Sequence, residues 1–325
     1  SNFRQAGYAY TTDGGATWHA NTYDPTVFRS DPVLDTTAAG TFHYNSLQTT
    51  FYSDELISTN WGQTWGSPNP ATGGDKQWIA IDKTPNSPGF GFVHQWWSTA
   101  GNNYSGRQYS RSTNGGTTWS NPINVPQRPI WGTIAIDTAG RIYLAGTASG
   151  APGLRVVRSS NANNGSVTPT FDVQTTPAML GDVNSGLSIN PGGLAGQVSC
   201  VADTGNSPYA GTIYILSSIY RDDNQNLDVV FAKSTNQGVT FFTLLKVNDD
   251  PTGQGHFHWF GTMSVAKNGR LDAIWLDTRH DPNKLLSELY YAYSLDGGTT
   301  WSANEQIAPA FNPLIGWPQQ NKIGD

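Results

Sequence analysis

The chain alternates short stretches rich in valine, isoleucine, threonine and aromatic residues with clusters of glycine, asparagine, aspartate and proline. The first kind of stretch is typical of β-strands, and the second is typical of the turns between them. No long run of alanine, leucine, glutamate and lysine follows the 3.6-residue period of a helix. The pattern predicts strands in groups of three, at residues 32–35, 41–44 and 50–57; 78–82, 91–97 and 107–112; 133–137, 142–145 and 154–158; 196–202, 212–217 and 227–233; and 262–266, 271–276 and 289–293. We therefore expect an all-β protein.

One phrase recurs between these groups, with the pattern Ser/Thr-x-Asp/Asn-x-Gly-x-Thr-Trp/Phe. Its full copies are residues 11–18, 58–65, 112–119, 234–241 and 294–301, and a degraded copy runs from Ser159 to Phe171. The Asp or Asn side chain can bond nearby backbone N–H groups and the Gly supplies a positive φ, so the phrase predicts a hairpin turn. Its aromatic residue is expected to fill the gap between neighbouring sheets. We interpret these residues as structural rather than catalytic.

Three strands, together with the strand that follows each turn, make a four-stranded antiparallel unit, which is one blade of a β-propeller. Five whole units lie between the first and the last copy of the phrase. The N-terminus enters at a third strand, residues 7–11, and the chain stops near the first strand of another unit. This favours six blades, with both ends sharing one blade, whereas seven would need a further segment. We expect residues 1–325 to be a single propeller domain, incomplete at one or both ends.

Charge and composition exclude several partners. The net charge is −6 with acidic and basic residues mixed along the chain, which argues against a surface for nucleic acid. No apolar run approaches the ~18 residues that a membrane span requires, so membrane insertion is not expected. The single cysteine, Cys200, lies in an apolar stretch, and we interpret it as a buried and inert thiol.

The recurring phrase is an Asp box, and Asp boxes on four-stranded units resemble the sialidase superfamily of BNR-repeat β-propellers. The resemblance covers essentially the whole chain and is nearest to secreted bacterial sialidase-like proteins, through residues 30–33, 75–82, 275–279 and 323–325. It implies a secreted or cell-surface location and a glycan partner. Sialidases hold the substrate carboxylate with three arginines, the first in a Phe/Tyr-Arg-Ile/Leu-Pro phrase. The sequence Phe28-Arg29-Ser30-Asp31-Pro32 keeps the Phe and Arg but displaces the Pro, and the other sialidase residues have no matching positions.

Residues just before or within the first strand of each blade share one end of a propeller, where loops usually build the site. Aromatic faces there can stack on sugar rings, while planar polar groups bind hydroxyls or a carboxylate. The substrate-binding candidates at these positions are Arg29, Gln77, Trp78, Trp131, Trp259 and Trp317, with Gln197 and Gln319 alongside them.

The segment 255–260 contains two histidines whose alternation puts His256 and His258 on one face of a strand. One interpretation makes them a catalytic acid/base pair or the edge of a metal site. Another has them bind a uronate carboxylate, as in polysaccharide lyases built on similar propellers. A third metal ligand at a recognisable spacing is absent, and two histidines that only pack a blade entrance are the structural alternative.

Two carboxylates complete the catalytic candidates. Asp277 and Arg279 alternate onto one face at the end of a second strand, where a mutual ion pair is the structural interpretation. If that pair reaches the channel, Asp277 is a candidate acid and Arg279 a substrate-binding anion clamp. Asp31, beside Arg29, is the other candidate acid.

An oxygen-rich loop follows the strand at 212–217. Asp222, Asn224, Asn226 and Asp228 are spaced like the start of a calcium loop, so a structural Ca²⁺ is one interpretation, although the EF-hand's central Gly and distal Glu are missing. A solvated hairpin turn is the other. No cofactor is required by any of these motifs.

The sequence supports three functions. The first is a secreted sialidase-like propeller that binds, and in one version cleaves, a glycan at the channel mouth. The second is a non-catalytic adhesin, matrix or appendage propeller, with neighbouring domains or subunits of a larger extracellular protein. The third is an acidic-polysaccharide lyase that uses His256 or His258 with a tyrosine.

Overall fold

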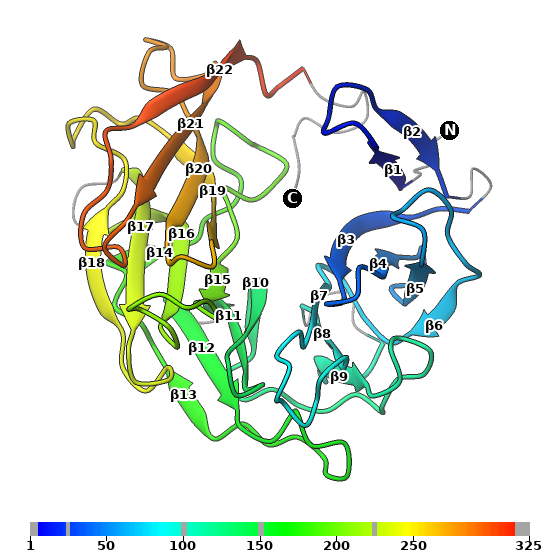
Figure 1. Cartoon of the computed structure of the whole chain (residues 1–325). Helices are drawn as coiled ribbons and strands as arrows, with labels where there is room; N and C mark the ends of the chain where they lie inside the picture. The colour runs from blue at the N-terminus through cyan, green and yellow to red at the C-terminus, as the bar shows by residue number, and fades with distance from the viewer. Residues whose placement is uncertain (1–5, 24–26, 99–102, 149–152, 223–225, 316–325) are drawn as a thin grey trace.

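The computed structural model describes residues 6–23, 27–98, 103–148, 153–222 and 226–315. Within them the protein is all-β, with antiparallel sheets that stand in a ring (Figure 1). Three of the sheets comprise β1 (Gly7–Tyr10) and β2 (His19–Thr22); β3 (Ser30–Thr36), β4 (Phe42–Leu47), β5 (Ser53–Ser58) and β6 (Asn69–Ala71); and β7 (Trp78–Ile81), β8 (Val93–Trp96) and β9 (Tyr109–Ser112).

The other three sheets of the described residues have four, five and four strands. They comprise β10 (Pro129–Ile136), β11 (Ile142–Ala148), β12 (Leu154–Ser159) and β13 (Val173–Thr175); β14 (Gly181–Asp182), β15 (Ser199–Ala202), β16 (Ile213–Arg221), β17 (Leu227–Ser234) and β18 (Phe242–Lys246); and β19 (His258–Val265), β20 (Leu271–Asp277), β21 (Ser287–Ser294) and β22 (Glu305–Phe311). Each predicted group of three strands is found within one sheet. In Figure 1, β3, β10 and β19 lie toward the centre of the ring and β6, β13, β18 and β22 toward its outside.

The sheets differ from the predicted blades in two places. The β7–β9 sheet has three strands, and its fourth is reduced to a bridge between Tyr109 and Ile123. The short β14 was not predicted, and it pairs with the far end of β16 beyond β15. The described residues contain six sheets, of which β1–β2 has only two strands, so the number of blades stays a prediction.

The Asp boxes form the predicted turns. In the third copy, Ser112 Oγ accepts a hydrogen bond from the backbone N–H of Gly116 (2.9 Å), and Asn114 Oδ1 accepts one from the N–H of Thr118 (2.9 Å). The equivalent bonds form in all the other full copies. In the degraded copy, Asn161 Oδ1 accepts the N–H of Thr170 (2.9 Å), so a longer turn keeps the same side-chain function.

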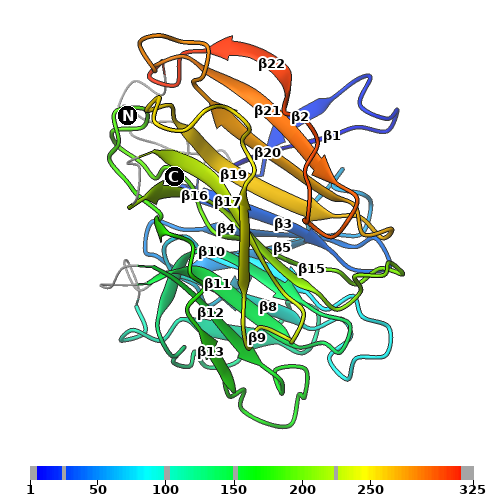
Figure 2. The same cartoon turned by 90° about the vertical axis from the view of Figure 1, so that its left-hand side faces the viewer.

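The hydrophobic core lies between neighbouring sheets. Figure 2 shows the stacked sheets from the side. The box aromatics fill these gaps as predicted: Trp65, Trp119, Phe171, Phe241 and Trp301 each pack against a core cluster. Trp18 is the exception and is 62% exposed. Cys200 is a buried free thiol, and burial raises its pKa to about 12, which agrees with an inert role. None of the described residues forms a helix that could cross a bilayer.

Strand register defines two faces of the ring. Ser30, at the start of β3, lies opposite Leu47, at the end of β4, and Leu47 lies opposite Ser53, at the start of β5. The same order holds for the other sheets, so the starts of first strands share one face, here called the mouth face. The ends of third strands, which run into the Asp boxes, share the opposite face, here called the box face.

Three of the first strands carry the same irregularity near the mouth face. Their register shifts after Ser30, Ile130 and Trp259, and the next residue in each has a positive φ. These residues are Asp31 (φ 48°), Trp131 (φ 56°) and Phe260 (φ 51°). A bulge bends its strand and turns the local backbone toward a neighbour. The Phe260 N–H accordingly donates to Ala195 O (2.8 Å), and Trp131 O accepts from the Val198 N–H (2.9 Å).

Candidate functional site

His258 is the centre of a buried polar group at the start of β19. Its side chain is 2% exposed, and its Nδ1 lies 2.8 Å from Leu227 O at the start of β17 in the neighbouring sheet. Its Nε2 lies 3.0 Å from Asp250 Oδ1 and 3.6 Å from Asp277 Oδ2. Burial alone would lower the pKa of His258, but the pair with Asp250 and the charge of Asp277 raise it above the ordinary histidine value.

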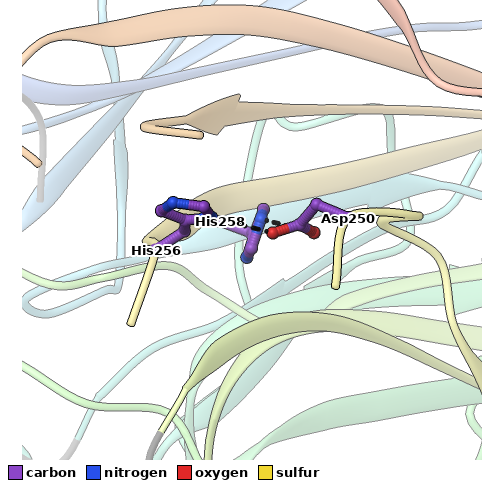
Figure 3. A group of neighbouring side chains, drawn as sticks. All are labelled: Asp250, His256 and His258. Carbon is purple, nitrogen blue, oxygen red and sulfur yellow. Dashed lines mark hydrogen bonds and ion pairs between the residues drawn. The ribbon is translucent and has the colours of Figure 1, made fainter. Parts of the chain in front are cut away.

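Asp250 joins the two histidines that the sequence singled out, as Figure 3 shows. Its Oδ2 lies 3.0 Å from His256 Nδ1, while its Oδ1 faces His258 and accepts a hydrogen bond from Asn248 Nδ2 (2.8 Å). Burial would raise the pKa of this carboxyl, but these partners, His258 first, hold it well below its ordinary value. We call Asp250, His256 and His258 the histidine cluster. Among the described residues it is the group of His, Cys, Asp and Glu close enough together to hold a metal ion.

Asp277 and Arg279 form the mutual ion pair of the structural interpretation. Asp277 is fully buried, and its Oδ2 accepts from Arg279 Nε (2.9 Å) and from Trp275 Nε1 (2.9 Å). The other Arg279 nitrogens reach Asp249 Oδ1 (2.7 Å) and Asn304 Oδ1 (3.0 Å). Because its three nitrogens already have acceptors, Arg279 is poorly suited to clamp an anion, and buried Asp277 is poorly suited to meet a substrate.

Arg29 and Asp31 lie on another part of the mouth face. Arg29 is buried, its Nη2 donates to Asp54 Oδ2 (2.7 Å), and its guanidinium lies over the Tyr23 ring. Its Nε and Nη1 have no hydrogen-bond partner among the described residues. Asp31 sits in the bulge of β3, where its backbone carbonyl accepts from Gln77 Nε2 (2.6 Å). No described hydrogen bond or ion pair joins these residues to the histidine cluster, so the predicted ring divides into separate parts.

The predicted aromatic ligand surface is largely used for packing. Trp259 has no exposed surface and donates its Nε1 to Ser287 Oγ (3.0 Å), so it cannot stack on a sugar. Trp78 and Trp131 are half-buried and pack against core clusters. Trp317 lies outside the described residues. The physical reason is that Trp78, Trp131 and Trp259 lie at the gaps between neighbouring sheets, where they pack with the core clusters.

The described members of the predicted calcium loop differ in burial and in their partners. Asp222 is exposed, whereas Asp228 is buried on β17, accepts a hydrogen bond from Asn248 Nδ2 (3.0 Å) and lies 3.6 Å from His258 Nδ1. Asn226 is buried and its Oδ1 accepts from the Gly255 N–H (3.1 Å). Asn224 lies outside the described residues. Asp228 therefore belongs to the surroundings of His258, and the calcium loop stays a prediction.

The structure shows an aromatic group on the mouth face that the sequence reading missed. Phe51 and Tyr52 lie in the turn before β5 and are 41% and 42% exposed. The Tyr52 ring meets the edge of Tyr104, with centroids 5.8 Å apart, and Tyr104 in turn contacts buried Trp97 at 5.6 Å. We call these four residues the mouth aromatic group. The sequence pattern places residues 50–52 in a strand, which hid the exposed turn. The signal that could have revealed Tyr104 is an aromatic residue inside a Gly/Asn-rich turn.

This aromatic group is connected to Arg29. Gln48 donates its backbone N–H to Tyr52 O (2.7 Å) and its Nε2 to Asp54 Oδ2 (2.6 Å), the oxygen that also accepts from Arg29. Phe51 holds a positive φ of 58° in the same turn, a conformation that costs a non-glycine residue free energy and therefore needs a supporting structure. Burial raises the pKa of Tyr104 to about 12, which keeps its hydroxyl protonated and able to donate.

The comparisons with known proteins support the fold. The BNR/Asp-box repeat family matches residues 9–20 and 292–303. An ulvan lyase of polysaccharide lyase family PL25 aligns with a TM-score of 0.54 at 12% identity, over 87% of this chain and 72% of the lyase. The Hadza microbial sialidase Hz136 aligns with a TM-score of 0.50 at 14% identity, over 87% of this chain and 59% of the sialidase. An arginine mutant of AofleA from Arthrobotrys oligospora aligns with a TM-score of 0.52 at 10% identity, over 94% of this chain and 87% of AofleA.

By sequence alone, no curated protein matches the chain. At identities this low, the structural likeness speaks for the fold and leaves the activity open. The matched repeats, the Asp-box turns and the ring of antiparallel sheets agree with one another. The chain is therefore a β-propeller with BNR/Asp-box repeats, consistent with the sialidase-like superfamily that its sequence resembles.

Proposed function

We propose that the protein binds an acidic glycan on the mouth face, at the end of the β3–β6 sheet. The observation that carries the proposal is the mouth aromatic group, in which half-exposed Tyr52 and partly buried Tyr104 lie edge to face. Gln48 connects the Tyr52 backbone to Asp54, the partner of Arg29. Exposed aromatic faces bind the C–H surfaces of sugar rings, and a tyrosine hydroxyl adds a polar contact at the edge.

Arg29 gives the preference for acidic sugars. A buried guanidinium with two nitrogens unpaired among the described residues is costly. We propose that a small side-chain movement on ligand binding presents those donors to a carboxylate or sulfate oxygen. Asp54 pairs with the third nitrogen of Arg29, Nη2, and so fixes the orientation of the guanidinium. A secreted or cell-surface location fits this ligand. The ulvan lyase and the sialidase named above are glycan-active propellers, which supports the same class of ligand for this chain.

A binding assay tests the proposal directly. Polyuronates, sulfated polysaccharides, sialosides and neutral glycans are titrated by calorimetry into the protein, Tyr52→Ala and Arg29→Lys. We expect Tyr52→Ala to lose about tenfold or more in affinity, which corresponds to ~1.4 kcal/mol or more. Arg29→Lys keeps the charge toward Asp54 but loses the planar fork, so it should weaken acidic glycans and spare neutral ones.

The matched control is Phe90→Ala. Phe90 is 50% exposed in the turn between β7 and β8, on the box face, so its loss should leave affinity unchanged. An equal loss in Phe90→Ala and Tyr52→Ala would contradict the proposed position. Failure of every glycan to bind the folded protein would favour the non-catalytic propeller that recognises a protein partner.

Cleavage is a second candidate, and one contact favours it. Asp250 Oδ2 lies 3.0 Å from His256 Nδ1, an arrangement that fixes the imidazole and leaves its Nε2 to take a proton. His258 is too buried for this role, and buried Asp277 does not suit hydrolysis. In β-elimination His256 takes the proton at C5 of a uronate, the C4=C5 double bond forms as the bond from C4 to the leaving oxygen breaks, and water supplies the proton that the leaving oxygen takes. The test follows the ultraviolet absorbance of the unsaturated product. His256→Ala should abolish formation of this product without changing the affinity for the glycan.

A further inference from the structure

We infer that the histidine cluster is a binding site for a divalent transition-metal ion such as Zn²⁺. Asp250 and His256 come from the segment between β18 and β19, and His258 is the first residue of β19. One ligand atom from each, a carboxylate oxygen or an imidazole nitrogen, lies within 4.8 Å of the others. One carboxylate and two imidazoles form a donor set that suits zinc in proteins. Asp250, six residues before His256, is the third ligand that the sequence reading did not find.

The tautomer of His258 points to a cation at this position. Its Nδ1 lies 2.8 Å from Leu227 O, and only a protonated nitrogen can donate to a carbonyl. In the neutral ring the lone pair is therefore on Nε2, which has no hydrogen-bond partner among the described residues. That nitrogen instead lies near two carboxylate oxygens, Asp250 Oδ1 at 3.0 Å and Asp277 Oδ2 at 3.6 Å. A lone pair facing two carboxylates is repulsive unless a positive charge lies between them.

Distances distinguish what this charge can be. Tetrahedral Zn²⁺ with bonds of ~2.0–2.1 Å holds its ligand atoms roughly 3.4 Å apart. His256 Nδ1 lies 3.0 Å from Asp250 Oδ2 and His258 Nε2 lies 3.0 Å from Asp250 Oδ1. Because the three ligand atoms lie within 4.8 Å of one another, closing by up to about 1.4 Å would bring them to the tetrahedral spacing. A proton shared between His258 Nε2 and Asp250 Oδ1 would neutralise the repulsion in that pair but would not involve His256. A metal ion would also use His256, whose side chain is partly exposed, and would leave a fourth position for water.

The surroundings support the ligands in the way that metal sites require. Leu227 O fixes the His258 ring, and Asn248 Nδ2 donates to Asp250 Oδ1, so two of the three ligands are oriented by a second partner. Such partners contribute to affinity because they hold the ligand atoms in place before the ion arrives.

The charge balance also favours a cation. Four carboxylates surround the cluster, and three side-chain cations pair with them. The carboxylates are Asp228, Asp249, Asp250 and Asp277, and the cations are Arg221, Lys246 and Arg279. The carboxylates therefore outnumber the arginine and lysine side chains by one, even though Lys246 Nζ lies 3.7 Å and Arg279 Nη2 4.0 Å from Asp250 Oδ1. Both cations approach Oδ1, the Asp250 oxygen that faces His258, so they will weaken the site, whereas Oδ2 faces His256.

The test is metal binding by the whole untagged protein, without any glycan. After dialysis against a chelator, Zn²⁺ is titrated by calorimetry, and Co²⁺ is added as a probe whose visible absorption reports tetrahedral coordination. We expect one equivalent to bind and to raise the melting temperature. His256→Ala should weaken binding by about 100-fold or more, because loss of a ligand exceeds the 10–100-fold cost of losing a second partner. This variant removes a partly exposed side chain and leaves the buried His258 pair intact.

His280→Ala is the matched control. His280 is also on the mouth face and pairs with Glu288 Oε2 (2.8 Å), but its side chain is 61% exposed and lies outside the cluster. Zn²⁺ affinity should be unchanged in this variant. Absence of Zn²⁺ binding by the wild-type protein, unchanged affinity in His256→Ala, or an equal loss in His280→Ala would each overturn the proposal. Since no glycan is used, failure here leaves the proposed glycan binding untouched.

Discussion

On the box face, all five full turns use the same side-chain bonds, whereas on the mouth face the described polar residues differ from sheet to sheet. Ser234 and Asn236 repeat the contacts of Ser112 and Asn114 at nearly equal distances. The mouth face instead carries an arginine–aspartate pair beside β3 and buried histidine, carboxylate and arginine beside β19. The residues that build the blades therefore repeat from sheet to sheet, whereas the residues available to bind a ligand differ.

The two faces also differ in charge and burial. The box turns satisfy backbone N–H groups with side chains from the same few residues, and those groups are mostly neutral and near solvent. The β19 end of the mouth face buries charged groups that come from two sheets. A buried charge depends on its partner far more than an exposed one, so substitutions should be more costly on the mouth face.

The largest expected effect is at Asp277. Asp277→Ala removes the carboxylate that accepts from Arg279 and Trp275 and leaves the guanidinium without its innermost partner. We expect a loss of about 3–5 kcal/mol in the free energy of unfolding, measured by urea denaturation. Asp272→Ala is the control on the same strand, because its pair with Arg270 is exposed and should contribute about 1 kcal/mol or less. Equal losses of unfolding free energy in the two variants would contradict the expectation that the buried ion pair contributes more to stability than the exposed one.

The sequence also predicted the box face better than the mouth face. The Asp-box turns were predictable because their contacts join residues two to four positions apart, so the spacing shows the geometry. Even the degraded copy was found from Ser159 and Asn161, although its insertion moves the accepting N–H to Thr170. Strand order followed from these turns.

The mouth face was harder because its contacts join distant parts of the chain. His258 meets Leu227, 31 residues earlier, and Arg29 meets Asp54, 25 residues later. No local spacing signals such pairs. Asp250 is only six residues before His256, but it was missed because the turn between them follows no strand or helix period. Trp259 was expected to face a ligand, but it is buried in a core cluster.

A smaller effect is expected from the box serines, and it tests whether the repeat is energetically uniform. Ser112→Ala and Ser234→Ala each leave a buried glycine N–H without its acceptor, 2.9 Å away in the native turn, so each should cost about 1–3 kcal/mol. Thr11→Ala should cost less, because its turn is more exposed and water can replace the lost bond to Gly15. The same urea titration gives all three values. A wide spread between the two serines would show that the box face is less uniform than its hydrogen bonds.

His94 gives the sharpest contrast with His258, because it is a buried histidine that no carboxylate contacts among the described residues. Its Nδ1 lies 2.7 Å from the Tyr109 hydroxyl, and burial, with help from the charge of Arg111, lowers its pKa to about 3. Since this folded-state pKa lies below the unfolded value near 6.5, the native state gains stability that is complete above about pH 6.5 and is lost as the pH falls toward 3. Below pH 6 the loss approaches about 1.4 kcal/mol per pH unit. We expect His94→Asn, which keeps a polar partner for Tyr109, to flatten the fall in unfolding free energy between pH 6.5 and 5 relative to the wild-type protein. Parallel curves for the two proteins would mean that His94 is already protonated in the folded state, and the contrast between the two histidines would then disappear.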